Sequence, residues 1–201
     1  MTNEKATATV LTQSQLFQKI TEWAEARNLI KGSTSVSQFA KFDSEFGELC
    51  TNILVFGGSY GRNDAERLAL ADDIGDCLVV LTIICEQEGL KINRIAPDVA
   101  PIDASVPFAD VLAIEGIKGL LADVLLKGQG AASVESLVSA LKAYFSAVAT
   151  KVGLSLEVCL AVAYNDIKDR TGVMYKGTFI KSTDPNYEAV KEQIALEAKS
   201  E

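Results

Sequence analysis

Long apolar stripes with helical spacing are the feature of this sequence that most constrains its fold. Apolar side chains recur every three or four residues from Phe39 to Phe56 and again from Leu70 to Ile84. Alternating runs of the kind that form half-buried strands, bounded by turn residues, are scarce along the chain. The pattern therefore predicts an all-α fold built as an antiparallel helical bundle.

The ends of the expected helices follow from capping and stop signals. We expect helices from Ser14 to Leu29, from behind the serine-rich segment 33–37 to Gly57, from Asp64 to Gly89, and from Val134 to Gly153. Three prolines, at positions 97, 101 and 107, interrupt the chain between the third and later helices. A connection that is not helical throughout is expected there.

We interpret residues 1–201 as a single all-α domain with two helical halves. Residues 14–90 form the first half, residues 108–172 form the second, and residues 183–201 form a tail with a short helix after Pro185. Segment 119–130 is similar to segment 48–58, which favours an internal pseudo-repeat of helical hairpins. Two unrelated amphipathic hairpins explain the similarity equally well.

The amino-acid composition excludes several classes of catalytic and binding site. The chain has no histidine, which excludes Ser-His and Cys-His nucleophile pairs and imidazole-rich zinc sites. The net charge of −8 argues against binding to a nucleic acid polymer, and the four cysteines lie in apolar stretches without a CxxC pair. With no basic-then-apolar leader and no apolar run of about 18 residues, we expect a cytoplasmic protein that does not enter a membrane.

Two pairs of acids stand out on adjacent predicted helices. Glu45 and Glu48, and then Asp73 and Asp76, are three residues apart, so that each pair lies on one helix face beside the apolar stripe. Packing the two helices together would gather four carboxylates, which repel each other unless a cation or protons neutralise them. The plainer interpretation is that such acids are solvated helix faces. The second half of the chain has no acids at the corresponding positions.

Oxygen ligands without histidine select a hard cation. Mg²⁺ fits best, Mn²⁺ is an acceptable substitute, and the spacing differs from that of a Ca²⁺-binding EF-hand loop. Because Mg²⁺ commonly completes its shell with substrate phosphates, the acids indicate a site for a phosphate ester or anhydride.

A second group of polar residues lies near the carboxyl end. This group combines an amide with two cations that suit phosphate oxygens, and its members are Asn165, Lys168 and Arg170. Cations at the carboxyl end of a helix also interact favourably with the helix dipole, which is a purely structural explanation. Trp23, on the first helix, is either a core residue or a platform for a nucleotide base.

These residues resemble a known family. Glu45-x-x-Glu48 followed by Asp73-x-x-Asp76 is similar to the ExxE…ExxD signature of the MazG-like, all-α nucleoside triphosphate pyrophosphatase superfamily, which includes the dimeric dUTPases. Segment 164–172 looks like the ending of phage and bacterial members. The resemblance covers residues 20–89 and 159–172.

The resemblance implies a Mg²⁺-dependent pyrophosphohydrolase that converts a nucleoside triphosphate, with deoxyribose expected, to the monophosphate and pyrophosphate in nucleotide-pool control. It implies that the four acids bind the metal and that Glu45 or Glu48 orients the attacking water. The residues that it places near the substrate are Trp23, Lys41, Asn165, Lys168 and Arg170.

The sequence departs from the family at Asp73, where Glu is common, so that Asp73 binds through water or Asp72 shares its role. The family also implies a homo-oligomer, a dimer or a tetramer, although a duplicated chain can complete its own bundle as a monomer. Two other functions stay open: a dUTPase-like specialist, and a helical bundle that binds nucleotide or a partner without turnover.

Overall fold

The computed structural model of the chain describes residues 11–56, 61–98 and 108–199 and is mostly helical. Its helices are α1 (Gln13–Ala26), α2 (Leu29–Gly32), α3 (Ser35–Val55), α4 (Asp64–Gln87), α5 (Ala109–Lys127), α6 (Ala131–Lys151), α7 (Leu156–Ile167) and α8 (Tyr187–Glu197), with one 3₁₀ turn, η1 (Ile92–Arg94). The helical class predicted from periodicity is confirmed. The more specific MazG type of bundle is not tested by these elements and stays a prediction.

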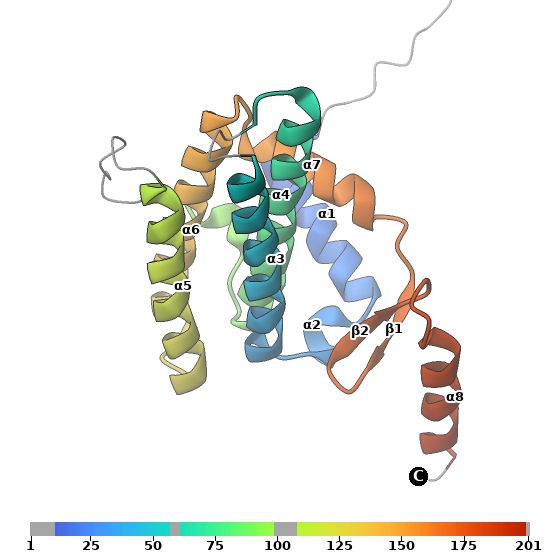
Figure 1. The fold of residues 1–201 in the computed structure, drawn as a ribbon. Coiled ribbons are helices and arrows are strands. Elements are labelled where there is room, and N and C mark those ends of the chain that lie inside the picture. Colours follow the sequence, from blue (N-terminus) through green and yellow to red (C-terminus); the bar gives the residue numbers. More distant parts are fainter. Residues whose placement is uncertain (1–10, 57–60, 99–107, 200–201) are drawn as a thin grey trace, which may run out of the picture.

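Two helical hairpins lie side by side. α3 packs against α4 and α5 packs against α6, while α3 also contacts α5 and α4 contacts α6 (Figure 1). α1 and α7 cover the other side of α4, which is buried on nearly all faces between residues 70 and 85. α4 is therefore the central helix, and any group on it is held by neighbours on several sides.

α4 and α7 approach each other closely at Gly75, inside the second acid pair. A Cβ atom at this residue would lie 2.3 Å from the backbone oxygen of Cys159 and 2.6 Å from the Cβ of Ala163, both on α7. A Cβ at Gly47, the equivalent glycine in the first acid pair, would meet nothing within 4 Å. The crossing of α4 and α7 therefore requires a glycine, whereas α3 does not.

Local capping explains where the helices begin, and it corrects one expectation. Thr34, in the serine-rich segment, caps α3 in a reciprocal pair with Ser37, and Asn63 caps α4. The single helix expected from Ser14 to Leu29 is wrong at its end: α1 stops at Ala26, because Asn28 adopts the left-handed conformation with φ of 57° and α2 begins a new direction.

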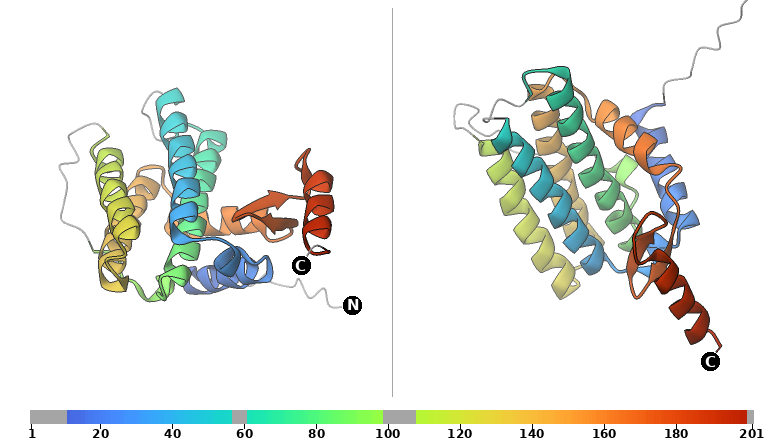
Figure 2. Two further views of the ribbon diagram at one scale, coloured as in Figure 1. Left: turned by 90° about the horizontal axis from the view of Figure 1, so that it is seen from below. Right: turned by 45° about the vertical axis from the view of Figure 1, so that its right-hand side comes forward.

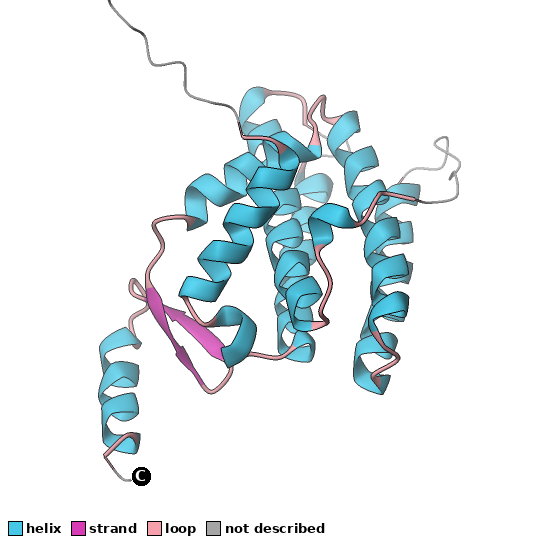
Figure 3. Cartoon of the chain, turned by 180° about the vertical axis from the view of Figure 1, so that it is seen from behind, coloured by secondary structure: helices cyan, strands magenta, loops and turns pink. Residues whose placement is uncertain are grey.

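A β-hairpin follows α7, which the sequence interpretation missed. β1 (Gly172–Tyr175) pairs antiparallel with β2 (Thr178–Lys181), and Figure 3 shows the pair beside α2. The two turn residues, Lys176 and Gly177, have φ of 48° and 81°, as a type I′ turn requires. α8 then packs against β1, has no fully buried residue and extends away from the helical body (Figure 2).

Among the described residues no single helix is long and apolar enough to cross a membrane; α6 and α7 meet the criteria only as a pair, and they are bent by 94°.

Candidate functional site

A cavity of about 200 Å³ lies where α1, α3 and α4 meet the β-hairpin. Its walls combine three kinds of side chain: acids and cations, an apolar floor from α4, and two aromatic rings. The lining residues are Trp23, Leu29, Ser37, Gln38, Lys41, Glu45, Asp76, Val79, Val80, Ile83, Ile167, Arg170, Gly177, Thr178, Phe179 and Lys181. Five of the nine residues predicted for the site are among them.

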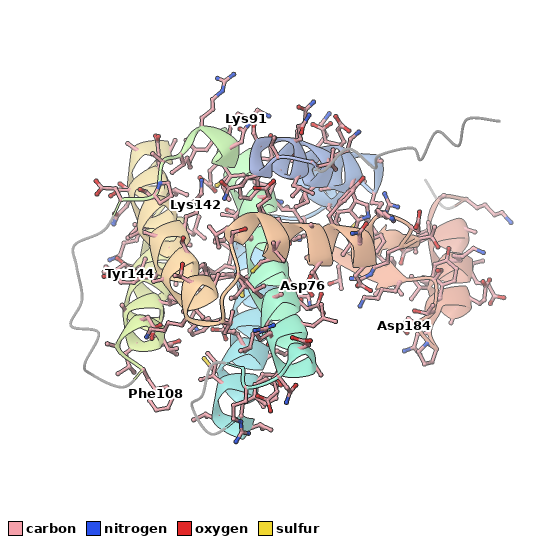
Figure 4. The ribbon with its side chains drawn as sticks, turned by 90° about the horizontal axis from the view of Figure 1, so that it is seen from above. Asp76, Lys91, Phe108, Lys142, Tyr144 and Asp184 are labelled. Carbon is pink, nitrogen blue, oxygen red and sulfur yellow. The ribbon has the colours of Figure 1, made fainter. Side chains whose placement is uncertain are left out.

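One acid from each predicted pair lines the cavity. Glu45 on α3 is only 7% exposed, and Asp76 lies part way along α4 (Figure 4). Lys41, one turn before Glu45 on the same helix, forms an ion pair with the Glu45 carboxylate. The other two acids do not line the cavity: Glu48 is exposed on α3, and Asp73 accepts a 2.7 Å hydrogen bond from the Asn52 amide.

Burial and repulsion by nearby acids raise the pKa values of Asp72, Asp73 and Asp76 on α4. The pKa of Asp76 rises to about 7, first because of burial and then because of the charges of Glu45 and Asp72. Burial also raises the pKa of Asp73 to about 6, against the lowering effect of the Asn52 hydrogen bond. The pKa of Asp72 is raised by burial and by nearby acids. Glu45 on α3 therefore raises the pKa values of all three of these acids on α4, and Glu48 raises those of Asp72 and Asp73.

The chemistry of this cluster fits a hard divalent ion, because its donors are carboxylate oxygens, and burial together with repulsion by neighbouring acids raises the pKa values of Asp73 and Asp76. The cluster does not form a complete coordination site: in the part of the chain that the structure describes, no three acidic or cysteine side chains are grouped so that they could hold a metal ion. Glu45 and Asp76, which both line the cavity, are the acids that could hold an ion there.

Three cations surround the same cavity. Lys41 comes from α3, Arg170 from the turn after α7, and Lys181 from the end of β2. Arg170 forms an ion pair with Asp166, one helical turn earlier, and its charge lowers the pKa of Asp76 against the dominant effect of burial. Cations next to buried acids suit a ligand that carries negative charge and brings a metal ion with it.

Asn165 and Lys168, the other two donors predicted near the carboxyl end, do not line the cavity. Both side chains are exposed, and the Lys168 ammonium donates a 3.0 Å hydrogen bond to the Asn165 amide oxygen. The turn that carries Arg170 inward thus leaves these two residues on the outer surface.

Trp23 is a core residue that also lines the cavity, and its role as a platform for a base stays a prediction. It is 8% exposed and belongs to the core, yet it lines the cavity, and the Phe179 ring contacts it edge-on with 6.5 Å between centroids. Its indole Nε1 is buried without a hydrogen-bond partner among the described residues. A flat ring bound in the cavity would therefore meet aromatic and aliphatic walls.

Sequence reasoning missed several lining residues. Gln38 donates its amide to the Ser33 hydroxyl at 2.9 Å, and this fixes its position on the wall. Phe179 and Lys181 come from the unpredicted hairpin. The signal for the hairpin was present in the apolar residues on either side of Lys176-Gly177, although Lys-Gly is a weaker turn signal than Asn-Gly.

Comparisons with known proteins give one informative match. No protein-family model matches the chain, and no solved structure matches it significantly. Over 73 residues, 36% of the chain, it is 41% identical to a protein of Haemophilus phage HP1 that is described as an uncharacterized 18.2 kDa protein in the rep-hol intergenic region. The match spans 39% of that protein's length. The chain is thus similar in part to a phage protein.

Proposed function

We propose that this chain is a Mg²⁺-dependent nucleoside triphosphate pyrophosphohydrolase, which converts a (deoxy)nucleoside triphosphate to the monophosphate and pyrophosphate. The observation that carries the proposal is the composition of one cavity: Glu45 and Asp76 from adjacent helices face it together with the cation Arg170 and the aromatic Trp23. A site for a nucleotide with a bound metal ion needs acids to hold the ion, cations to neutralise the phosphates and an aromatic ring to stack on the base.

Each charged residue of the cavity has its own role in the proposed reaction. Glu45 and Asp76 would hold the ion, which when bound supplies charge neutralisation for the phosphates and activation of water. Arg170, Lys41 and Lys181 neutralise the triphosphate tail, and Lys41 exchanges its contact with Glu45 for one with a phosphate. As the buried acid, Glu45 is better placed than the exposed Glu48 to orient a water inside the cavity.

The test is pyrophosphate release from each of the common NTPs and dNTPs, dUTP included, with Mg²⁺ and with EDTA. We expect metal-dependent turnover, and Glu45→Gln should lower kcat by about 100-fold or more. The matched control is Glu115→Gln, which removes an exposed acid of α5 that pairs with Lys118 outside the cavity. Equal activity of Glu45→Gln and the control would refute the assignment.

A non-catalytic nucleotide-binding protein is the second candidate. Two observations favour it: the described acids do not form a complete coordination site, and Glu45 is already paired with Lys41. Binding of triphosphate without pyrophosphate release would support this candidate, whereas turnover of dUTP alone would indicate a dUTPase-like specialist.

We also propose a homo-oligomer, a dimer or a tetramer, because α8 extends from the body without a fully buried residue. An 11-residue helix with so few contacts has little stability alone in water. Multi-angle light scattering of the full chain measures the mass directly, and a monomeric mass at all concentrations would contradict this proposal.

A further inference from the structure

The Arg27 guanidinium joins two walls of the cavity without lining it. Arg27 is the residue that ends α1, and its Nε donates a 2.6 Å hydrogen bond to the backbone oxygen of Arg170. Its Nη2 donates to the backbone oxygen of Lys168 at 3.0 Å, and its Nη1 donates to the backbone oxygen of Trp23 at 3.3 Å. One side chain thus connects α1 to a turn more than 140 residues later in the chain.

The same guanidinium also lies over the Trp23 ring, with 5.1 Å from its central carbon to the ring centroid. Trp23 and Arg170 both line the cavity, one on the aromatic wall and the other among the cations. Movement of Arg27 would therefore disturb both the Trp23 ring and the backbone that carries Arg170.

We propose that Arg27 is a positioning residue, which holds the Arg170 turn and the Trp23 ring in the arrangement that binds a nucleotide. This inference rests on the proposed function, since it assigns a role in the same cavity. Arginine suits the task because its planar fork has five N–H donors and a flat face, so that it bonds three carbonyl oxygens and stacks on a ring at once. Lysine has neither the fork nor the face.

The simpler alternative is that Arg27 only stabilises the carboxyl end of α7. Lys168 caps the carboxyl end of α7, where backbone carbonyls lack helical partners, and an arginine there stabilises the helix end. A cap alone would change the stability of the fold but not the energetic coupling to Arg170. The two roles are therefore separated by a double-mutant cycle on ligand binding.

The experiment measures binding of the non-hydrolysable α,β-imido analogues of dATP, dGTP, dCTP and dUTP with Mg²⁺. Trp23 is the single tryptophan of the chain, so its fluorescence reports on the cavity directly. Arg27→Met and Arg170→Met should each weaken binding of the best analogue about tenfold. Because one residue acts through the other, the double variant should lose no more than about 20-fold, well below the roughly 100-fold expected of independent sites.

Arg62→Met is the matched control, because Arg62 is exposed, does not line the cavity and pairs with Glu66 on α4. It should bind the analogues within about twofold of the unmodified protein. Melting curves identify any variant that does not fold, and if Arg27→Met fails, Arg27→Lys takes its place in the cycle with a loss of at least about fivefold expected.

Three results would overturn the inference: binding by the folded Arg27 variant that equals that of the unmodified protein, losses that multiply in the double variant, or no binding of any analogue by the unmodified protein. Failure of the proposed function looks different. In that case the unmodified protein binds an analogue and the cycle shows coupling, yet no natural triphosphate is hydrolysed.

Discussion

Replacing Asp76 with asparagine should stabilise the metal-free protein at pH 8. In the folded protein the pKa of Asp76 is about 7, whereas the ordinary value is 3.8. The folded state therefore keeps this proton between about pH 4 and pH 7, where the unfolded chain has released it, so that stability falls as the pH rises through this window. Above pH 7 the folded state carries the full penalty of a buried charge, and asparagine removes it.

The magnitude follows from the same two pKa values. At about 1.4 kcal/mol per pKa unit, the penalty above pH 7 is at most about 4 kcal/mol. Neighbouring acids share the repulsion and water screens part of it, so we expect Asp76→Asn to gain about 2 kcal/mol at pH 8. For a chain of this size that gain corresponds to a rise in Tm of roughly 4–8 °C. At pH 4 the gain should be close to zero.

The assay is thermal melting from pH 4 to pH 8 in EDTA, with and without an excess of Mg²⁺. The control is Asp123→Asn, an exposed acid on α5, which should change Tm little at any pH. Mg²⁺ should raise the Tm of the unmodified protein at pH 8 and raise that of Asp76→Asn less, because the variant lacks a ligand. A variant that is less stable at pH 8, or a gain that does not depend on pH, would refute the electrostatic reasoning.

Three further predictions concern packing and the cavity. Gly75→Ala should lose more than about 3 kcal/mol of stability in urea unfolding because its Cβ would meet α7, whereas Gly47→Ala should gain up to about 1 kcal/mol; equal effects would contradict the helix crossing. Lys142→Met should lose about 2–3 kcal/mol in the same assay, because the buried Lys142 ammonium donates to two backbone oxygens at η1, and an unchanged midpoint would show that these bonds contribute nothing. Phe179→Ala should weaken binding of the triphosphate analogues about three- to tenfold and shift the emission of Trp23 to longer wavelength; unchanged emission would mean that the hairpin does not cover the ring in solution.

The helices were predictable because their signals are local. The apolar stripes, the capping residues around Thr34 and Asn63, and the glycines that follow α4 and α6 lie within a few residues of the structure that they specify, whereas the stop expected at Gly57 lies outside the described residues. The break at Asn28 was harder to predict, because the apolar stripe continues through it and only a single left-handed residue changes direction. The hairpin at residues 172–181 was missed for a related reason: two four-residue strands carry too short an alternation to outweigh the helical pattern around them.

The candidate site was only partly predictable. The spacing of the acids places each pair on one helix face, and this much follows from the sequence alone. Phe179, Lys181 and Gln38 join the cavity through tertiary contacts that no local pattern records. Asn165 and Lys168 were predicted at the site but lie outside it. The segment that contains them looks like one motif in the sequence, yet only Arg170 lines the cavity, while Asn165 and Lys168 are exposed on the outer surface.

The antiparallel packing of α3 and α4 explains why the four acids are not equivalent. When two antiparallel helices pack, the first acid of one pair faces the second acid of the other, so that Glu45 is matched with Asp76 and Glu48 with Asp73. The charges bear this out, because Glu45 is the strongest ionic influence on the pKa of Asp76, whereas Glu48 acts more strongly than Glu45 on Asp73. Glu45 and Asp76 line the cavity, whereas Glu48 is exposed and does not. Two pairs that look equal in the sequence thus become one pair that lines the cavity, Glu45 and Asp76, and one pair that does not, Glu48 and Asp73.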